Sequence, residues 1–422
     1  MKNRRPKFFY GYVVVGVAVC ALVVYWGTFY TFGVFFKPVS TTFGWTRATT
    51  SAAFSINALV WGVTEVVAGK LSDRFGPRAI VTAGGLFIGL GYLLMSQISG
   101  ALWQLYLFYG VIVAIGMGCA FVPIVSTVAK WFVKRRGLMT GIVVSGIGIG
   151  TMLIPPLATR LIATYDWSLY YMIVGAIALV FITLAAQFLR RDPAQMRQLP
   201  DGADELETES VAANGAGSSL REAIRTRQFW MLSALFFSFF FCLNTIMVHI
   251  VNHATDLPTS PRILETTAAN ILVIIGGTSI AGRLAMGAFA DRIGIRLTVI
   301  ITLAVVTVAL FWLLWANELW MLYLFGVIFG FGYGGLVALT SPLAANLFGL
   351  GSHGVILGIT FFVGALGQSL GPFLAGKIFD ATTSYQPAFI ICGVLAIICI
   401  ILALLLRPTT GKGGANETRR ST

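Results

Sequence analysis

The residue in this sequence with the clearest chemical capability is Arg283, which lies in the otherwise apolar stretch IGGTSIAGRLAMGAF. A guanidinium keeps its charge at physiological pH and presents forked N–H donors that match a carboxylate. Inside an apolar helix, an arginine costs several kcal/mol unless it has a partner or water. The sequence therefore predicts a receptor for a carboxylate at Arg283. The alternative is an arginine that snorkels or has a structural partner.

Polar and aromatic residues in other apolar stretches are candidates for the same binding site. Tyr30, Asn244, Tyr333 and Gln368 can hydrogen-bond to a carboxylate, hydroxyl or carbonyl group. We add Ser279, which precedes Arg283 by one helical turn. For these residues the alternative is hydrogen bonding between helices, and for Tyr30 it is an aromatic wall without ligand contact.

Three titratable side chains lie in apolar stretches. His249 and His253 are four residues apart and would share one face of a helix, and imidazole titrates at useful pH. We expect His249 to be a candidate for proton coupling or gating and His253 to be a satisfied core or interfacial residue. Glu65 is a second proton candidate, although pairing with a nearby basic loop residue is the preferred interpretation.

No pattern in the sequence indicates a metal, a cofactor or an enzyme. The five cysteines form no CxxC or Cys/His cluster, and the histidine pair has no third ligand. HExxH, GxSxG and phosphate-binding glycine loops with their structural context are also missing. We therefore expect neither metal nor cofactor, and no catalytic activity.

The elements that must position these residues follow from the composition. Apolar residues make up 57% of the 422 residues and charged residues only 11%, with a mean hydropathy of +0.85, whereas soluble proteins carry about 25% charge. Apolar stretches of sufficient length cross a hydrocarbon core of about 30 Å as helices. We predict an all-α polytopic membrane protein with twelve transmembrane helices. The spans are 10–36, 51–69, 79–98, 103–129, 138–159, 167–189, 229–252, 267–290, 297–317, 319–345, 354–376 and 386–406.

The basic residues are distributed unevenly between the two sides of these spans. With both termini placed inside, the inner segments hold 23 Lys and Arg residues, the outer loops hold five, and the remaining one is Arg283. This bias predicts cytoplasmic termini in the cell (inner) membrane. The net charge of +13 is assigned to topology and membrane lipid, not to nucleic acid. The five outer residues are Lys37, Arg47, Arg160, Arg262 and Lys377.

The segment 190–228 differs in composition from the rest of the chain. It is rich in charge, Gly, Ser and Pro, and it separates two sets of six spans. We interpret it as a cytoplasmic linker, partly disordered, with a short amphipathic helix near Leu220 to Thr226. The predicted parts are an N-terminal six-helix bundle at 1–189, the linker at 190–228, a C-terminal six-helix bundle at 229–407 and a cytoplasmic tail at 408–422.

The two sets of spans repeat each other. GKLSDRFGPR at 69–78 recurs as GAFADRIGIR at 287–296, an offset of 218. LYLF at 105–108 recurs at 322–325, and Gly137 and Gly141 correspond to Gly354 and Gly358, each at an offset of 217. Internal repeats of this kind mark secondary transporters, which bind substrate near mid-membrane between the repeats.

The repeated loop motif has its own predicted role. Gly76 and Gly294 allow a tight turn between consecutive spans. The charged residues of both copies can pair or cap a neighbouring helix and so latch a bundle in one state, and static turn chemistry is the alternative. These latch residues are Asp73, Arg74, Asp291 and Arg292.

On these motifs the sequence resembles the major facilitator superfamily. The loop GKLSDRFGPR and its second copy match the family's hallmark loop, and the similarity covers the chain apart from the linker and tails. WFVKRRGLMTGIVVSGIGIG at 131–150 resembles the fifth-helix signature of the monocarboxylate transporters. YTFGVFFKPVSTTFGWTRATTS at 30–51 and GQSLGP at 367–372 are shared by that family and the bacterial oxalate/formate antiporters. The chain is therefore similar to a bacterial monocarboxylate transporter.

The resemblance implies roles for particular residues. In both families an arginine at the position of Arg283 binds the substrate carboxylate. The antiporters add a lysine in helix 11 to hold a dicarboxylate, but span 11 has no lysine before Lys377, which favours a monoanion. The animal monocarboxylate transporters have a lysine at the position of Tyr30 and an aspartate at that of Ser279, and these are held to relay the proton. That relay pair is absent here.

The resulting expectation is a secondary active transporter with a central cavity that opens alternately to either side. Arg283 would hold a small monocarboxylate such as lactate or pyruvate, a proton would be co-transported, and the chain would function as a monomer. The alternative is an oxalate/formate-type organic anion antiporter.

Overall fold

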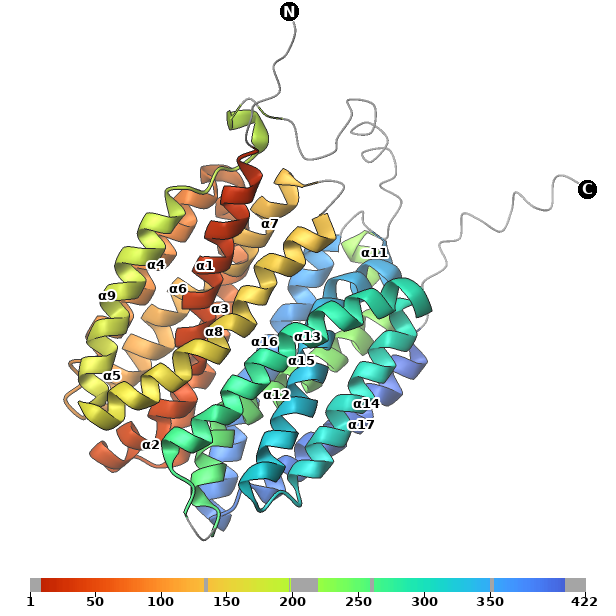
Figure 1. The fold of residues 1–422 in the computed structure, drawn as a ribbon. Coiled ribbons are helices and arrows are strands. Elements are labelled where there is room, and N and C mark those ends of the chain that lie inside the picture. Colours follow the sequence, from red (N-terminus) through yellow and green to blue (C-terminus); the bar gives the residue numbers. More distant parts are fainter. Residues whose placement is uncertain are drawn as a thin grey trace, which may run out of the picture.

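The computed structural model describes residues 9–132, 136–196, 198, 219–258, 262–349 and 353–406. Within these residues, twelve helical segments are long and apolar enough to cross a membrane. They form two bundles that stand beside each other (Figure 1). The predicted fold class, twelve transmembrane helices in two pseudo-symmetric six-helix bundles, is confirmed.

The first bundle contains the helices α1 to α9. Its first span consists of two helices that meet at Thr31, and its fourth span is a series of four short helices that includes the π-helix η1. The bounds are α1 Gly11–Tyr30, α2 Phe32–Phe43, α3 Arg47–Phe75, α4 Pro77–Met95, α5 Leu102–Leu105, η1 Tyr106–Val113, α6 Ala114–Gly118, α7 Phe121–Trp131, α8 Arg136–Thr164 and α9 Trp167–Ala186.

A short helix precedes the second bundle, as the sequence predicted. This helix, α11 (Leu220–Ile224), begins at a capping box formed by Ser219 and Glu222. Most of the predicted linker, and all of the predicted tail, lie outside the described residues. The remaining bounds are η2 Pro193–Met196, α12 Arg227–Asp256, α13 Glu265–Ile293, α14 Ile295–Leu313, α15 Leu319–Phe348, α16 His353–Thr382 and α17 Gln386–Leu405.

Many helices extend beyond the predicted spans. The second span runs from Arg47 to Phe75 instead of 51–69, because the Thr46 side chain caps its first turn by accepting from the Thr49 N–H. A helix ends where its terminal backbone groups find partners, not where hydropathy falls. Four of the five basic residues expected in outer loops therefore lie in helices: Lys37 in α2, Arg47 in α3, Arg160 in α8 and Lys377 in α16. The fifth, Arg262, lies outside the helices.

The chain defines two sides of the molecule. We call the side where α1 begins and α17 ends the terminal side, which is at the top of Figure 1. The opposite side, where α2 ends and α3 begins, is the far side. Each span connects one side with the other, so consecutive turns alternate between them.

Two long helix pairs join the bundles. α3 packs on α16, and α8 packs on α13; the second pair runs side by side across the front of Figure 1. These pairs connect span 2 with span 11 and span 5 with span 8, and the sequence repeat relates one pair to the other. The contact between the bundles therefore has the same twofold character as the sequence. α2 adds a further contact with α12 at the far side.

The repeated turn motif has nearly the same backbone conformation in both bundles. Gly76, between α3 and α4, has φ 87° and ψ 157°, and Gly294, between α13 and α14, has φ 89° and ψ 148°. A side chain is strained at such a positive φ, so glycine is required. The predicted tight turns are confirmed at both positions.

Close approach of α13 and α15 sets the position of Arg283. A Cβ atom at Gly334 of α15 would overlap the backbone of Ser279 in α13, and one at Gly282 would overlap the backbone of Phe331. Small residues let transmembrane helices approach until their backbones touch. This contact places Tyr333, next to Gly334, against the helical turn that carries Arg283.

The alanine variant Gly334→Ala should destabilise the protein, because the new methyl group must separate α13 from α15. Overpacking of this kind costs about 1–3 kcal/mol, so the midpoint of thermal unfolding of the detergent-purified protein should fall. Gly358→Ala in α16 is the matched control, since a Cβ atom there meets nothing within 4 Å. Equal midpoints for the two variants would contradict the packing argument.

Candidate functional site

Arg283 is buried at the centre of the contact between the bundles, with an exposed fraction of 4%. Its Nη1 donates to Ser279 Oγ at 3.1 Å and its Nη2 to the Tyr333 hydroxyl at 3.3 Å. Ser279 Oγ in turn donates to the Gly276 carbonyl oxygen at 2.7 Å. Both partners of the guanidinium are neutral, so its charge is not cancelled by them.

One of the three guanidinium nitrogens of Arg283 has no partner among the described residues. Nε is buried without a hydrogen bond, and neither of the two ion pairs found within the described residues involves Arg283. A buried N–H without an acceptor costs about 1–3 kcal/mol, and more when the group is charged. The guanidinium therefore has unused capacity for an anion.

The first bundle supplies the other wall of this site. Tyr30 at the end of α1 is buried, and its hydroxyl lies near Tyr333 and the Arg283 guanidinium. Gly148 of α8 lies against the guanidinium, since a Cβ atom there would be 2.8 Å from Nη1. The structure thus brings together four of the predicted site residues, from three helices and both bundles: Arg283, Ser279, Tyr333 and Tyr30.

Asn244 and Gln368 are buried in the second bundle, on α12 and α16. Asn244 Nδ2 donates to the Phe240 carbonyl oxygen of its own helix at 3.0 Å, while Asn244 Oδ1 and Gln368 Nε2 have no partner. Among the described residues, neither side chain hydrogen-bonds to the Arg283 group. Both keep free polar atoms, so their predicted substrate contact stays a prediction.

Two residues near this region were not singled out by the sequence. Gly148 belongs to the motif at 131–150, and its contact with the guanidinium becomes visible only in three dimensions. Trp61 of α3 has a buried indole Nε1 without an acceptor and packs edge-on against Phe29, the neighbour of Tyr30. A tryptophan in an apolar stretch carries no signal that separates it from lipid-facing ones.

Charged residues from both bundles meet at the far side. Asp256 at the end of α12 pairs with Lys37 Nζ of α2 at 3.2 Å and with Arg47 Nη2 of α3 at 2.6 Å. Asp380 of α16 accepts from the backbone N–H groups of Arg47 and Ala48 at 3.0 and 2.8 Å, and so caps the start of α3. Acidic groups of the second bundle thereby hold basic groups and a helix start of the first.

His249 extends this contact into the core. Its Nε2 lies 2.9 Å from the Pro372 carbonyl oxygen, and its Nδ1 lies 3.1 Å from the Tyr385 hydroxyl. The Tyr385 hydroxyl oxygen accepts a hydrogen bond from Arg47 Nη1 at 2.5 Å. Burial raises the pKa of the Tyr385 hydroxyl above its usual range, despite the opposing effect of Arg47. We call the group His249, Asp256, Lys37, Arg47, Asp380 and Tyr385 the far-side cluster.

The other titratable candidates have fewer contacts. His253 shares the face of His249, as predicted, and packs edge-on against Phe389 at 5.0 Å between ring centroids. Its Nε2 is buried without a partner, so the expectation of a satisfied histidine is wrong; the surrounding rings offer no acceptor. Within the described residues, no group of three His, Cys, Asp or Glu side chains could hold a metal ion.

Glu65 is half-buried in α3. None of the ion pairs within the described ranges involves Glu65, so the expected partner among the basic loop residues is not found there. The repeat offset of 218 relates Glu65 to Arg283. The two bundles therefore carry opposite charges at equivalent positions of spans 2 and 8.

The predicted latch residues lie at the terminal side. Arg74 and Arg292 are exposed, and the Arg74 guanidinium lies 5.1 Å from the ring centroid of Phe75. The side chains of Asp73 and Asp291 lie outside the described part of the structure. The latch therefore stays a prediction.

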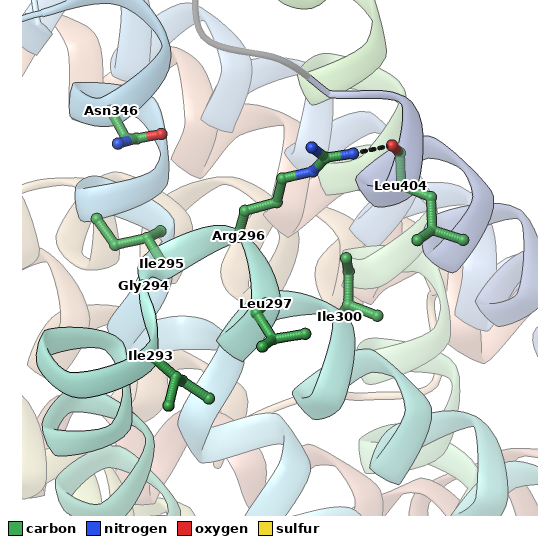
Figure 2. Close-up of a pocket in the computed structure, with 8 residues that line it drawn as sticks. All are labelled: Ile293, Gly294, Ile295, Arg296, Leu297, Ile300, Asn346 and Leu404. Carbon is green, nitrogen blue, oxygen red and sulfur yellow. Dashed lines mark hydrogen bonds between the residues drawn. The ribbon is translucent and has the colours of Figure 1, made fainter.

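A pocket of about 460 Å³ lies at the terminal side, away from Arg283. Figure 2 shows Arg296 reaching across it to donate to the Leu404 carbonyl oxygen, with Asn346 opposite. The walls of this pocket are mostly apolar, and the pocket opens to the surface of the molecule. The lining residues are Ile293, Gly294, Ile295, Arg296, Leu297, Ile300, Asn346 and Leu404.

Comparison with known proteins decides the family. The family model of the Major Facilitator Superfamily matches residues 17–285 and 254–421. The chain belongs to the major facilitator superfamily. This transporter is 27% identical to YhjX of Escherichia coli strain K12, an uncharacterized MFS-type transporter. The similarity extends over 345 residues and covers 81% of this chain and 82% of that protein.

Its relatives include monocarboxylate transporters. Monocarboxylate transporter 13 of Rattus norvegicus is 28% identical over 400 residues, covering 93% of this chain and 88% of the relative. Monocarboxylate transporter 12 of Homo sapiens is 25% identical over 392 residues, covering 87% and 75%. The resemblance that the sequence motifs indicated is confirmed.

A solved structure supports the fold. The bacterial homolog of the human lysosomal transporter Spinster, in an inward-facing and unoccupied conformation, matches with a TM-score of 0.70 at 15% identity, covering 94% of this chain and 96% of that one. At this identity the likeness establishes the fold of the transporter and nothing about its substrate.

Replacing the cap at the start of α3 should weaken the transporter. Asp380→Ala removes both acceptors of the Arg47 and Ala48 N–H groups, and the loss of a helix cap costs about 1 kcal/mol. The midpoint of thermal unfolding should therefore fall. Glu265→Ala, which removes another exposed acid at the far side, should leave the midpoint nearly unchanged. An equal fall in both variants would show that Asp380 acts only through its charge.

Proposed function

We propose that the protein transports a small monocarboxylate, such as lactate or pyruvate, with Arg283 as the receptor for the carboxylate. The supporting observation is that the guanidinium is buried between the bundles with neutral partners and an unused Nε. A carboxylate would accept from Nε and Nη and cancel the charge. Tyr30, Tyr333 and Ser279 would orient the anion, and Asn244 and Gln368 are candidates for its other polar groups.

Neutralisation of Arg283 by the bound anion would shift the equilibrium between the states of the transport cycle. An uncompensated guanidinium favours states in which water reaches it, because burial without a counter-charge is costly. A bound anion removes that cost and so favours the occluded state. The substrate then has different affinities for the two states, which is the condition for a ligand to shift their equilibrium.

The number of buried cations favours a monoanion. Among the described residues, Arg283 is the only lysine or arginine classed as buried, and Lys377 is exposed at the far end of α16. A dicarboxylate would leave its second charge without a cation. An oxalate/formate-type organic anion antiporter is the second candidate, because its family shares the motifs at 30–51 and 367–372.

We further propose that transport is coupled to a proton. Ser279 and Tyr30 are not ionic at physiological pH, so neither can replace the relay pair of the animal relatives. His249, which lies against Phe36 and Ser51 of the first bundle, and Glu65, the repeat equivalent of Arg283, are the candidates to carry the proton. One proton with one carboxylate would make transport electroneutral.

We place the transporter in the cell (inner) membrane as a monomer, with the terminal side in the cytoplasm. The distribution of Lys and Arg, 23 on that side against five on the other, supports this orientation. The far side is then the outer side. Asp73, Arg74, Asp291 and Arg292 would form the cytoplasmic latch.

The variant Arg283→Ala should abolish uptake of radiolabelled lactate by proteoliposomes. Removing one partner of a buried ionic contact costs about 2–5 kcal/mol, equivalent to at least about a 30-fold loss of affinity. Arg160→Ala, which removes an exposed arginine of α8, should transport like the parent protein. Normal uptake by Arg283→Ala would overturn the receptor role of this residue.

The driving force separates the two candidate functions. An inward proton gradient should drive accumulation of lactate in vesicles that contain no counter-anion, because a symporter needs no exchange partner. Uptake that occurs only with internal formate or oxalate would instead establish exchange. If no carboxylate enters under either condition while the protein is correctly folded, the carboxylate proposal itself fails.

A further inference from the structure

The hydrogen bonds around His249 have determined directions. The Pro372 carbonyl oxygen can only accept, so His249 Nε2 must carry a proton and donate to it at 2.9 Å. Arg47 can only donate, so the Tyr385 oxygen accepts from Nη1 at 2.5 Å. The Tyr385 O–H is then free to donate to His249 Nδ1, 3.1 Å away. Neutral His249, protonated on Nε2, satisfies every member of this chain.

A second proton on His249 cannot be accommodated in this arrangement. Nδ1–H would face the Tyr385 oxygen, and Tyr385 would lose its acceptor. The imidazolium would also share that hydroxyl with the Arg47 guanidinium. Its other close neighbours are uncharged: the Phe36 ring, at 5.2 Å between centroids, and Ser51 Oγ at 3.5 Å.

The carboxylates of the cluster are already engaged. Asp256, on the same helix as His249, is shared between Lys37 and Arg47, and Asp380 accepts from the start of α3. His253, the remaining titratable group on this face, lies one turn along α12 and packs against the Tyr385 and Phe389 rings. No free counter-charge therefore faces His249 from any of the described elements packed against it: α2, α3, α16 and the start of α17.

We propose that the chain from Asp256 through Arg47, Tyr385 and His249 to Pro372 is the outer gate of the transporter, and that protonation of His249 opens it. Arg47 of α3 is the member of this chain that belongs to the first bundle, and it bonds to Asp256 of α12 and to Tyr385 at the start of α17. A charged His249 that competes with Arg47 for the Tyr385 hydroxyl therefore weakens the outer contact between the bundles. Protonation favours whichever state accommodates the imidazolium, which is the open, hydrated one. The proposal takes only the orientation from the proposed function, not the substrate.

Spin labels across the outer side test this gate without any substrate. Thr42 at the end of α2 and Thr382 at the end of α16 are both exposed and belong to different bundles. Thr42→Cys and Thr382→Cys are labelled in a chain whose exposed Cys20 is replaced by serine. Double electron–electron resonance then gives the distance between the two spin labels in the reconstituted protein. A longer-distance population should grow as pH falls from about 8 to about 5.5, where exposed imidazoles become charged.

Three further variants separate the gate from general effects of acid. His249→Gln can still donate to Pro372 and accept from Tyr385 but cannot be protonated, so the short distance should persist at both pH values. His253→Gln, the matched control one turn away, should respond like the parent. Tyr385→Phe breaks the chain and should show the long distance already at about pH 8.

The same measurements can overturn the proposal. A pH response that survives in His249→Gln would exclude His249 as the sensor, and a parent protein without a response would exclude the switch. A short distance in Tyr385→Phe would show that the chain does not hold the gate. Because no carboxylate is present, each result is independent of whether Arg283 binds one.

Discussion

The contact between the bundles is built around one buried positive charge that has no acidic partner among the described residues. Arg283 lies between the bundles with only neutral oxygens as partners, and one of its donors is unused. Under the proposed function, a charge in this position disfavours the occluded state until an anion binds. α15 at Gly334 packs directly on the backbone of Ser279, and α8 at Gly148 packs directly on the guanidinium, so close packing surrounds this charge.

In the far-side cluster, unlike at Arg283, the charges are paired. There every acid that crosses between the bundles has basic or N–H partners, and these pairs stabilise the contact between α3, α12 and α16. The paired charges hold the bundles together at the far side, while under the proposed function the unpaired charge of Arg283 opposes closure until a substrate binds. A transporter needs both effects, because each of its states must be stable enough to be populated and weak enough to be left.

The internal duplication explains the geometry but not the chemistry. The equivalent turns at Gly76 and Gly294 and the equivalent pairs α3–α16 and α8–α13 follow from repetition of one six-helix unit. At the repeat-related positions of spans 2 and 8, however, the residues are Glu65 and Arg283. A symmetric scaffold therefore carries an asymmetric charge, and the proposed carboxylate site belongs mainly to the second bundle, with Tyr30 and Gly148 contributed by the first.

The sequence by itself determined the number and order of the spans, the duplication, the conspicuous Arg283 and the turn glycines, because hydropathy, charge and positive φ are local properties. It also identified Tyr30, Ser279 and Tyr333, since polar groups are rare in apolar stretches. Only the tertiary structure decided that these residues meet, that Glu65 lacks the expected partner within the described residues, and that Asp256, Arg47, Tyr385 and His249 form one chain. Those contacts join residues up to 338 positions apart, and they arise from the packing of two bundles, which no local pattern specifies.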